Sequence, residues 1–210
     1  MGRLIQRLVT SSLFALSLYS APYTARDFSK LPDRVTGLHP TLLSMHITLY
    51  EGYVKNTNAL LEALDTVDPS SIAFGALKRR FGWEYDGMVL HERYFEALGP
   101  AFPLPSTDPL YQAIVDSFGS YEAWERNFRS TGLIRGIGWV ILYRDPQEGR
   151  LYNVWINEHD LGHLAGGELI LVMDVWEHAY ITQFGLDRAT YIDTFIKNIN
   201  WNFVSKKFKN

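Results

Sequence analysis

The spacing of apolar residues predicts a long helix in the first half of the chain. Residues 41–64 carry apolar side chains at helical intervals, at Leu42, Leu49, Tyr50, Tyr53, Val54, Leu60, Leu61 and Leu64. This spacing places the side chains on one face of an α-helix, so we expect one amphipathic helix. The turn-forming sequence DTVDPSS ends it, and residues 85–98 predict a second helix that Gly99 and Pro100 end.

The rest of the chain mixes helical and strand patterns. A linker is expected at 99–109, where GPAFPLPSTDP carries four prolines in eleven residues. Apolar runs predict three strands, GWVILY, RLYNVWI and ELILVMD, and the hairpin sequence RDPQEG joins the first two. Further helices are expected at 111–118, 120–134 and 190–199. We therefore expect a helical hairpin domain over 23–99 and a C-terminal domain over 110–210.

The N-terminal segment, residues 1–22, differs in character from the rest of the chain. No acidic residue precedes Asp27, and the apolar run at 8–20 is too short to span a bilayer. This layout predicts a secretory signal, with Ala15-Leu16-Ser17 as a cleavage site, or a mitochondrial transit peptide. The mature protein would then be exported, to a periplasm or outside the cell, or mitochondrial. An ordinary extension on a cytoplasmic protein is the alternative.

Composition narrows the chemistry that the chain can perform. Its 210 residues, 47% hydrophobic and 14% aromatic, suffice for a core in one domain or two small ones. A net charge of −3 lacks the basic excess that nucleic-acid binding needs. The absence of cysteine excludes disulfides, iron–sulfur clusters and thiol catalysis. A metal ion would therefore be bound by His, Asp or Glu.

Four residues stand out as candidate metal ligands. In LVMDVWEHAY, Asp174 and His178 are four residues apart where the third strand ends, so both side chains can point at one place. His91 lies among apolar residues of the second predicted helix, and His46 shares a face of the first with Tyr53. Three buried imidazoles and one carboxylate can share one metal ion.

Simpler interpretations of these four residues compete with a metal site. A single buried histidine is more often a hydrogen-bonded core residue, and Asp174 suits a helix N-cap beside an incidental His178. From spacing alone both interpretations stay open.

Five stretches together resemble one known family. DVWEHAY and the following YIDTFIKNINW resemble the C-terminal signature of the iron/manganese superoxide dismutases. LHERYFEAL, YEGYVKNTN and GIGWVIL resemble segments of the second helix, the first helix and the first strand of that family. The likeness extends from about Tyr23 to Asn210. It implies an α+β fold: a long antiparallel helical hairpin followed by an α/β domain with a three-stranded antiparallel sheet.

The resemblance also implies a cofactor and a reaction. His46, His91, Asp174 and His178 would bind one iron or manganese ion per chain, and a water or hydroxide would complete a five-coordinate site. Such a centre converts superoxide into dioxygen and hydrogen peroxide, an antioxidant oxidoreductase activity. A metal-dependent enzyme acting on another substrate is a rival, and so is a non-catalytic structural subunit of a larger assembly with this fold.

Residues around the ligands receive roles from the same resemblance. Tyr53 would stand at the substrate gateway, Trp139 and Trp176 would form an apolar wall, and Tyr94 and Arg188 would lie nearby. Composition by itself explains each of these aromatic residues as core packing.

The partner of the bound solvent is expected to be a histidine. Many family members use a glutamine from one of two places, and this chain has Gly87 at the first and His159 at the second. We therefore expect His159 to take this role, with His163 as a structural neighbour. Iron and manganese remain alternatives.

Two departures from the family pattern are visible. Six residues separate His46 from Tyr53, where family members often have seven, which predicts a regular helix in place of one with a π-bulge. Met45 occupies the position of the longer spacing and is a poor ligand for these metals. Ile141 replaces the second tryptophan of the family's GWxW sequence.

The resemblance finally implies a homodimer. No nucleic acid is expected as a partner, because the net charge is −3, and no membrane is expected after processing. Glu177 would reach His178 of the second copy across a two-fold axis. Many members pair a histidine and a tyrosine across this interface. Leu49 and Ile181 occupy those positions here, so we expect them to touch between protomers.

Overall fold

The computed structural model describes residues 22–209. Residues 1–21, which hold the expected targeting run, and Asn210 lie outside the described residues. Within 22–209 no helix is long and apolar enough to cross a membrane. The division into two domains stays a prediction.

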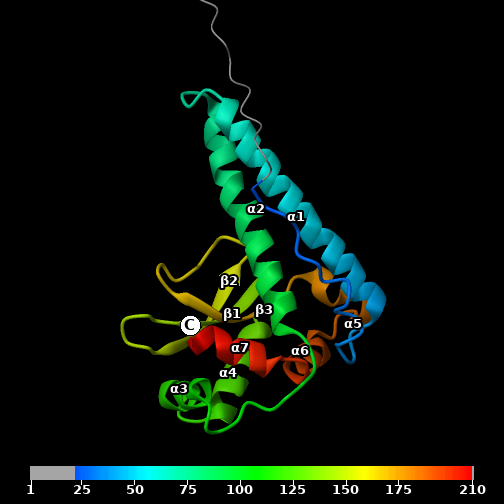
Figure 1. Ribbon diagram of the computed structural model, residues 1–210, viewed down its shortest axis with the longest axis vertical. Coiled ribbons are helices and arrows are strands. Elements are labelled where there is room, and N and C mark those ends of the chain that lie inside the picture. The colour runs from blue at the N-terminus through cyan, green and yellow to red at the C-terminus, as the bar shows by residue number, and fades with distance from the viewer. Residues whose placement is uncertain (1–21, 210) are drawn as a thin grey trace, which may run out of the picture.

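Two long helices form the hairpin that projects from the body of the molecule (Figure 1). Helix α1 spans Pro40–Thr66 and α2 spans Ile72–Ala97. The helix predicted at 41–64 is thus confirmed. His39 starts α1 by accepting a hydrogen bond from the Thr41 amide, and Pro40 follows at a position where its missing N–H costs nothing.

The predicted start of α2 at residue 85 is wrong. Ser71 caps the helix, with its hydroxyl accepting from the Phe74 amide, so α2 includes the whole stretch from Ile72. That stretch contains Gly75, Gly82 and three successive basic residues, which interrupt the helical spacing of its apolar residues. Packing against α1 stabilises helix here where the local pattern is weak.

The C-terminal part is built on a three-stranded antiparallel sheet, as expected. Strands β1 (Gly138–Arg144), β2 (Leu151–Asn157) and β3 (Glu168–Asp174) lie in the order β2-β1-β3. The central strand β1 is buried almost throughout. Its Trp139 pairs with Ile156 on one side and with Asp174 on the other, which fixes the register at the end where β3 stops.

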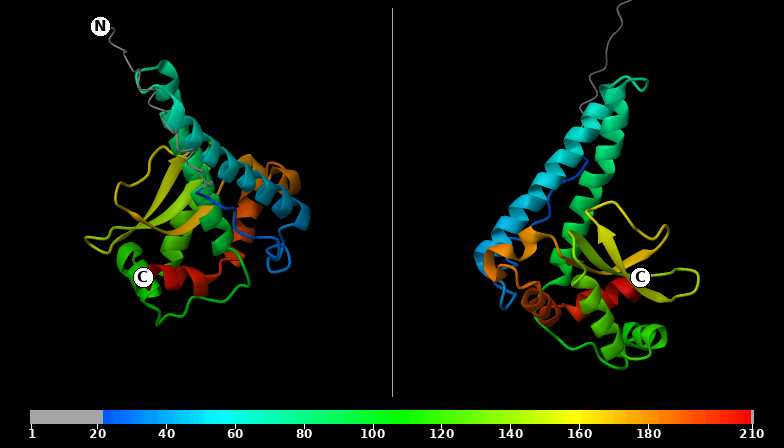
Figure 2. Two further views of the ribbon diagram at one scale, coloured as in Figure 1. Left: turned by 45° about the horizontal axis from the view of Figure 1, so that its top comes forward. Right: turned by 180° about the vertical axis from the view of Figure 1, so that it is seen from behind.

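Helices pack around this sheet and close its core. Helices α3 (Pro109–Phe118) and α4 (Tyr121–Gly132) precede it, close to their predicted ranges. After β3 come η1 (Glu177–Ala179), α5 (Ile181–Phe184), α6 (Arg188–Lys197) and α7 (Trp201–Lys209). The apolar pattern did not predict α7, which packs against α2, α3 and β3 and lies beside the sheet in both views of Figure 2.

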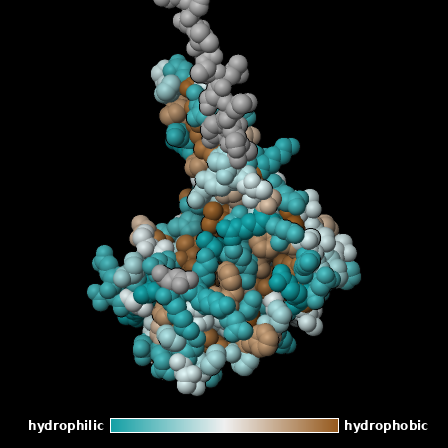
Figure 3. All heavy atoms as spheres, viewed as in Figure 1, coloured by the Kyte–Doolittle hydropathy of each residue, from teal (hydrophilic) through white to brown (hydrophobic). Residues whose placement is uncertain are grey.

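One core runs from the hairpin into the sheet. Tyr50, Phe95, Tyr94 and Trp139 are almost fully buried and belong to the same cluster. Ile141, in place of the family's second tryptophan, is fully buried in it. On the face shown in Figure 3 hydrophilic residues cover most of the lower body, with hydrophobic residues visible between them.

Candidate metal centre

The four candidate ligands meet in the structure. One ligand atom from each of His46, His91, Asp174 and His178 lies within 4.8 Å of all the others. Asp174 Oδ2 is the focus: it lies 3.1 Å from His46 Nε2, 3.6 Å from His91 Nε2 and 3.1 Å from His178 Nε2. Bonds of about 2.0–2.2 Å to one metal ion would place ligand atoms at such separations.

Each ligand comes from a different part of the fold. His46 is on α1, His91 on α2, Asp174 is the last residue of β3, and His178 lies in η1. The Trp176 amide donates to Asp174 Oδ1 at 2.7 Å. This bond turns the other carboxylate oxygen, Oδ2, towards the histidines.

His91 gives the clearest sign of a cation site. Its Nδ1 lies 2.6 Å from the Gly87 carbonyl, which can only accept, so the hydrogen is on Nδ1. Burial lowers the pKa of His91 well below 6.5, and the imidazole is neutral. Nε2 therefore carries an unprotonated lone pair. The atom is fully buried, has no hydrogen-bond partner and faces a carboxylate oxygen. A cation between them satisfies both groups, and a histidine whose other nitrogen donates to a carbonyl is typical of metal ligands.

The pKa shifts of the other buried ligands suit the same interpretation. Burial lowers the pKa of His46, although Asp174 partly opposes this. For Asp174 burial alone would raise the pKa, but the charge of His178 and hydrogen bonds from His178 and His46 outweigh burial and lower it. The cluster thus presents three imidazoles and one carboxylate, a donor set that binds redox-active first-row metals.

Tyr53 and His159 form a hydrogen-bonded pair beside the cluster. The Tyr53 hydroxyl lies 2.7 Å from His159 Nε2, and the Trp139 indole donates to His159 Nδ1 at 3.1 Å. Burial lowers the pKa of His159 to about 4, so the ring is neutral at pH 7 and carries one hydrogen. An indole can only donate. Nδ1 is therefore the acceptor, Nε2–H donates to the tyrosine oxygen, and the hydroxyl hydrogen of Tyr53 is left available.

The regular first helix expected from the spacing is confirmed. Helix α1 runs without a π-bulge, and both His46 and Tyr53 face the cluster. Met45 is 56% exposed, whereas His46 beside it is 2% exposed and lies in the cluster. On α2, Gly87 leaves space that the Tyr53 ring fills, since a Cβ there would lie 2.6 Å from the ring.

Aromatic rings enclose the cluster on several sides. Trp176 stacks on His159 and on His178, and Tyr94 packs against His46. Two contacts were not anticipated from the sequence. The rings of Trp83 and His159 meet nearly at right angles, and the Tyr191 hydroxyl donates to the Asp174 carbonyl at 2.7 Å. Neither residue has a local sequence signal, because both are separated from their partners by many residues.

The remaining expected residues lie at the edge of this region. Arg188 donates to the Tyr180 hydroxyl and to the carbonyls of Ile134 and Gly136, so it braces the segment after His178. The exposed residues Glu177, Leu49 and Ile181 lie on η1, α1 and α5.

Comparison with known proteins places the chain in a family. Residues 106–207 match the family model described as iron/manganese superoxide dismutases, C-terminal domain. A superoxide dismutase [Fe] of Cupriavidus metallidurans is 37% identical over 193 residues, covering 89% of this chain and 96% of the relative. The chain belongs to the iron/manganese superoxide dismutase family. Superoxide dismutase [Mn] 1 of Halobacterium salinarum, 31% identical over 198 residues, covers 92% of this chain and 96% of the relative. Relatives named for iron and for manganese both match, so the likeness indicates the family and not one metal.

Proposed function

We propose that this chain is a superoxide dismutase that binds one iron or manganese ion through His46, His91, Asp174 and His178. The observation that carries this proposal is the buried lone pair of His91 Nε2, which faces Asp174 Oδ2 at 3.6 Å without a partner. Membership in the family and the donor set of three imidazoles and one carboxylate support it.

The reaction consumes two superoxide anions and two protons. The first superoxide loses an electron and leaves as dioxygen, and the second gains that electron, takes up both protons and leaves as hydrogen peroxide. The bound ion supplies the reversible one-electron exchange between the two halves. The protein has to hold the ion, admit a small anion and deliver protons.

The residues beside the cluster deliver protons and exclude water. We assign Tyr53 and His159 to the proton path, because their hydrogen bond leaves the Tyr53 hydroxyl hydrogen free to donate. Burial raises the pKa of Tyr53 well above its ordinary value, so the hydroxyl keeps its proton at neutral pH. Trp139, Trp176 and Trp83 surround His159 and limit the entry of water.

Metal analysis joined to a superoxide consumption assay tests this function. Protein loaded separately with iron and with manganese should bind about one ion per chain and consume superoxide with at least one of them. His91→Ala should lose both properties. The exposed His39 supplies a matched control, because His39→Asn removes a histidine and replaces its Nδ1 acceptor at the N-cap with an amide oxygen. A wild-type chain that binds no metal would favour the structural-subunit alternative.

We further propose a homodimer built on the face that carries Leu49, Ile181 and Glu177. Leu49 and Ile181 are 37% and 39% exposed, and Met45 on the same helix as Leu49 is 56% exposed. Exposed apolar side chains of this kind gain stability when a second copy covers them. Sedimentation at several protein concentrations should give twice the mass of one chain.

For residues 1–22 we propose removal during export or mitochondrial import. Protein isolated from its native source should show cleavage upstream of Tyr23, as read by N-terminal sequencing. A native protein that retains Met1 would indicate an uncleaved extension.

A further inference from the structure

The turn that carries His159 contains a strained residue. Asn157 and Leu161 bond to each other across it, amide to carbonyl at 2.9 and 3.3 Å. Between them Glu158 has φ of +53°, the one non-glycine residue with positive φ in 22–209. A left-handed conformation is disfavoured for a residue that carries a side chain. Such a conformation persists where surrounding contacts hold it in place.

Two contacts hold the backbone of Glu158, the residue before His159. The Glu158 amide donates to the Ile137 carbonyl at 3.2 Å, and the Trp176 indole donates to the Glu158 carbonyl at 3.3 Å. Neither reaches the peptide that follows His159, whose orientation also sets the direction of the ring.

His163 holds that second peptide. Its Nε2 lies 2.8 Å from the His159 carbonyl, and its Nδ1 lies 2.5 Å from the Tyr143 hydroxyl. Because a carbonyl only accepts, Nε2 carries a hydrogen and donates it, while Nδ1 pairs with the Tyr143 hydroxyl. The Asp86 carboxylate of α2, 3.8 Å from Nε2, favours the hydrogen at the same end of the ring.

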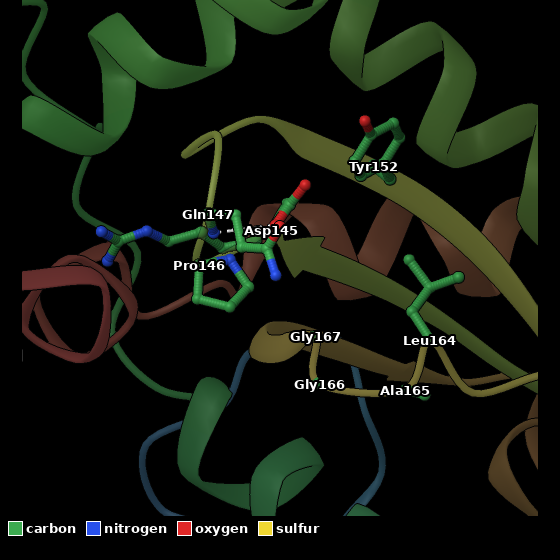
Figure 4. A pocket seen from close by; sticks show the side chains of 9 residues that line it. Asp145, Pro146, Gln147, Tyr152, Leu164, Ala165, Gly166 and Gly167 are labelled. Atoms are coloured by element: carbon green, nitrogen blue, oxygen red, sulfur yellow. Dashed lines mark hydrogen bonds between the residues drawn. The ribbon is translucent and has the colours of Figure 1, made fainter.

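Tyr143 is a rigid anchor for His163. It is 1% exposed and belongs to the central strand β1. The loop after His163 runs through Leu164 to Gly167, seen in Figure 4 beside the hollow that Asp145 and Pro146 also line. At Gly167 the backbone passes close over Tyr143, since a Cβ there would lie 2.8 Å from its ring.

We propose that His163 is a positioning residue for the dismutase reaction. His163 connects Tyr143, which is fixed in β1, to the His159 carbonyl. This connection keeps the His159 ring between Tyr53 and Trp139. The catalytic meaning of this arrangement rests on the function proposed above. The geometry itself depends only on contacts between residues of this chain.

Three variants separate the two contacts of His163. His163→Leu removes both of them. His163→Gln keeps a donor near the place of Nε2 and is the conservative rescue. Tyr143→Phe removes a single oxygen and leaves His163 bonded to His159. Each is compared with the wild type in the metal-loaded protein for metal content, melting temperature, visible absorption spectrum, midpoint potential and turnover.

His163→Leu should keep its metal, change the spectrum and potential, and lower turnover about tenfold, because small misplacements near a reacting centre have large effects on rate. His163→Gln should recover most of the loss, and Tyr143→Phe should fall between. If His163→Leu fails to fold, Tyr143→Phe still decides the matter by its spectrum. An unchanged spectrum, potential and turnover in a folded variant would overturn the proposal. An inactive metal-loaded wild type would instead count against the proposed function, while the spectra would still report on positioning.

Discussion

The ring of Tyr53 occupies the space that a side chain at Gly87 would need: a Cβ added to Gly87 would lie 2.6 Å from Tyr53 Cδ1. The second helix therefore presents no side chain to the cluster at the place where many family members have a glutamine. The polar group beside the Tyr53 hydroxyl is His159, whose Nε2 lies 2.7 Å from it.

Gly87→Ala should destabilise the protein and lower its activity. Alanine normally stabilises a helix relative to glycine by about 0.5–1 kcal/mol. Here the added methyl group forces the Tyr53 ring aside, and overpacking of this kind costs about 1–3 kcal/mol. Gly82→Ala on the same helix is the control, because nothing lies within 4 Å of a Cβ there. Urea unfolding should show a lower free energy of unfolding than the wild type for Gly87→Ala and a higher one for Gly82→Ala. Equal free energies of unfolding for the two variants would refute the steric account.

His159→Ala should keep the fold and the metal but shift the redox potential and reduce turnover. The variant removes the partner of Tyr53 and leaves the Trp139 indole without its acceptor, a loss of about 1–3 kcal/mol for a buried donor. His159→Gln is the informative comparison, since its carbonyl oxygen can accept from Trp139 and its amide can donate to Tyr53. Turnover and potential should therefore rank wild type, glutamine and alanine in that order. An alanine variant as active as the wild type would remove His159 from the mechanism.

Asp108→Asn should destabilise the protein at neutral pH and flatten its acid sensitivity. Burial raises the pKa of Asp108, but hydrogen bonds from Lys209, Ser205 and the Leu110 amide outweigh it and lower the pKa below 3.8. A lowered pKa stabilises the folded state above pH 3.8, and that contribution is lost as pH falls through the folded pKa. The variant keeps a side-chain oxygen for the N-cap but loses the charged acceptor of Ser205 and Lys209, a loss of about 0.5–1.5 kcal/mol.

The measurement for Asp108 is urea unfolding between pH 2 and 7 on apoprotein, so that metal release does not contribute. Asp116→Asn, at an exposed position of the same helix, makes the same change of charge and serves as the control. A difference between Asp108→Asn and wild type that stays constant down to pH 2 would contradict the linkage.

Leu49→His should weaken the proposed dimer, because an imidazole would be buried against the partner's Ile181 at a cost of about 1–3 kcal/mol. Adding Ile181→Tyr should recover part of this loss, since the two new polar groups can bond across the interface. Sedimentation equilibrium of wild type, both single variants and the double variant gives the coupling energy. Strictly additive effects, or a fully active monomer, would show that these residues do not meet.

Much of the fold follows from patterns that are local in the chain. The helix at 40–66 and the three strands were predicted because apolar periodicity depends on residues only a few positions apart. The start of α2 and the existence of α7 were not, since their stability comes from packing against distant elements. The four candidate ligands were recognised by their type and by a family likeness, and their convergence is a property of the folded chain.

The sequence by itself determined which chemistry is available: no thiol, six histidines, and an Asp174–His178 pair at the end of a strand. The tertiary structure alone decided which nitrogen of each histidine is free. His91 Nδ1 bonds to Gly87 and leaves Nε2 bare, whereas Trp139 and Tyr53 occupy both nitrogens of His159. A histidine is the same residue in either place, and its role is set by the donors and acceptors that the fold brings to its ring.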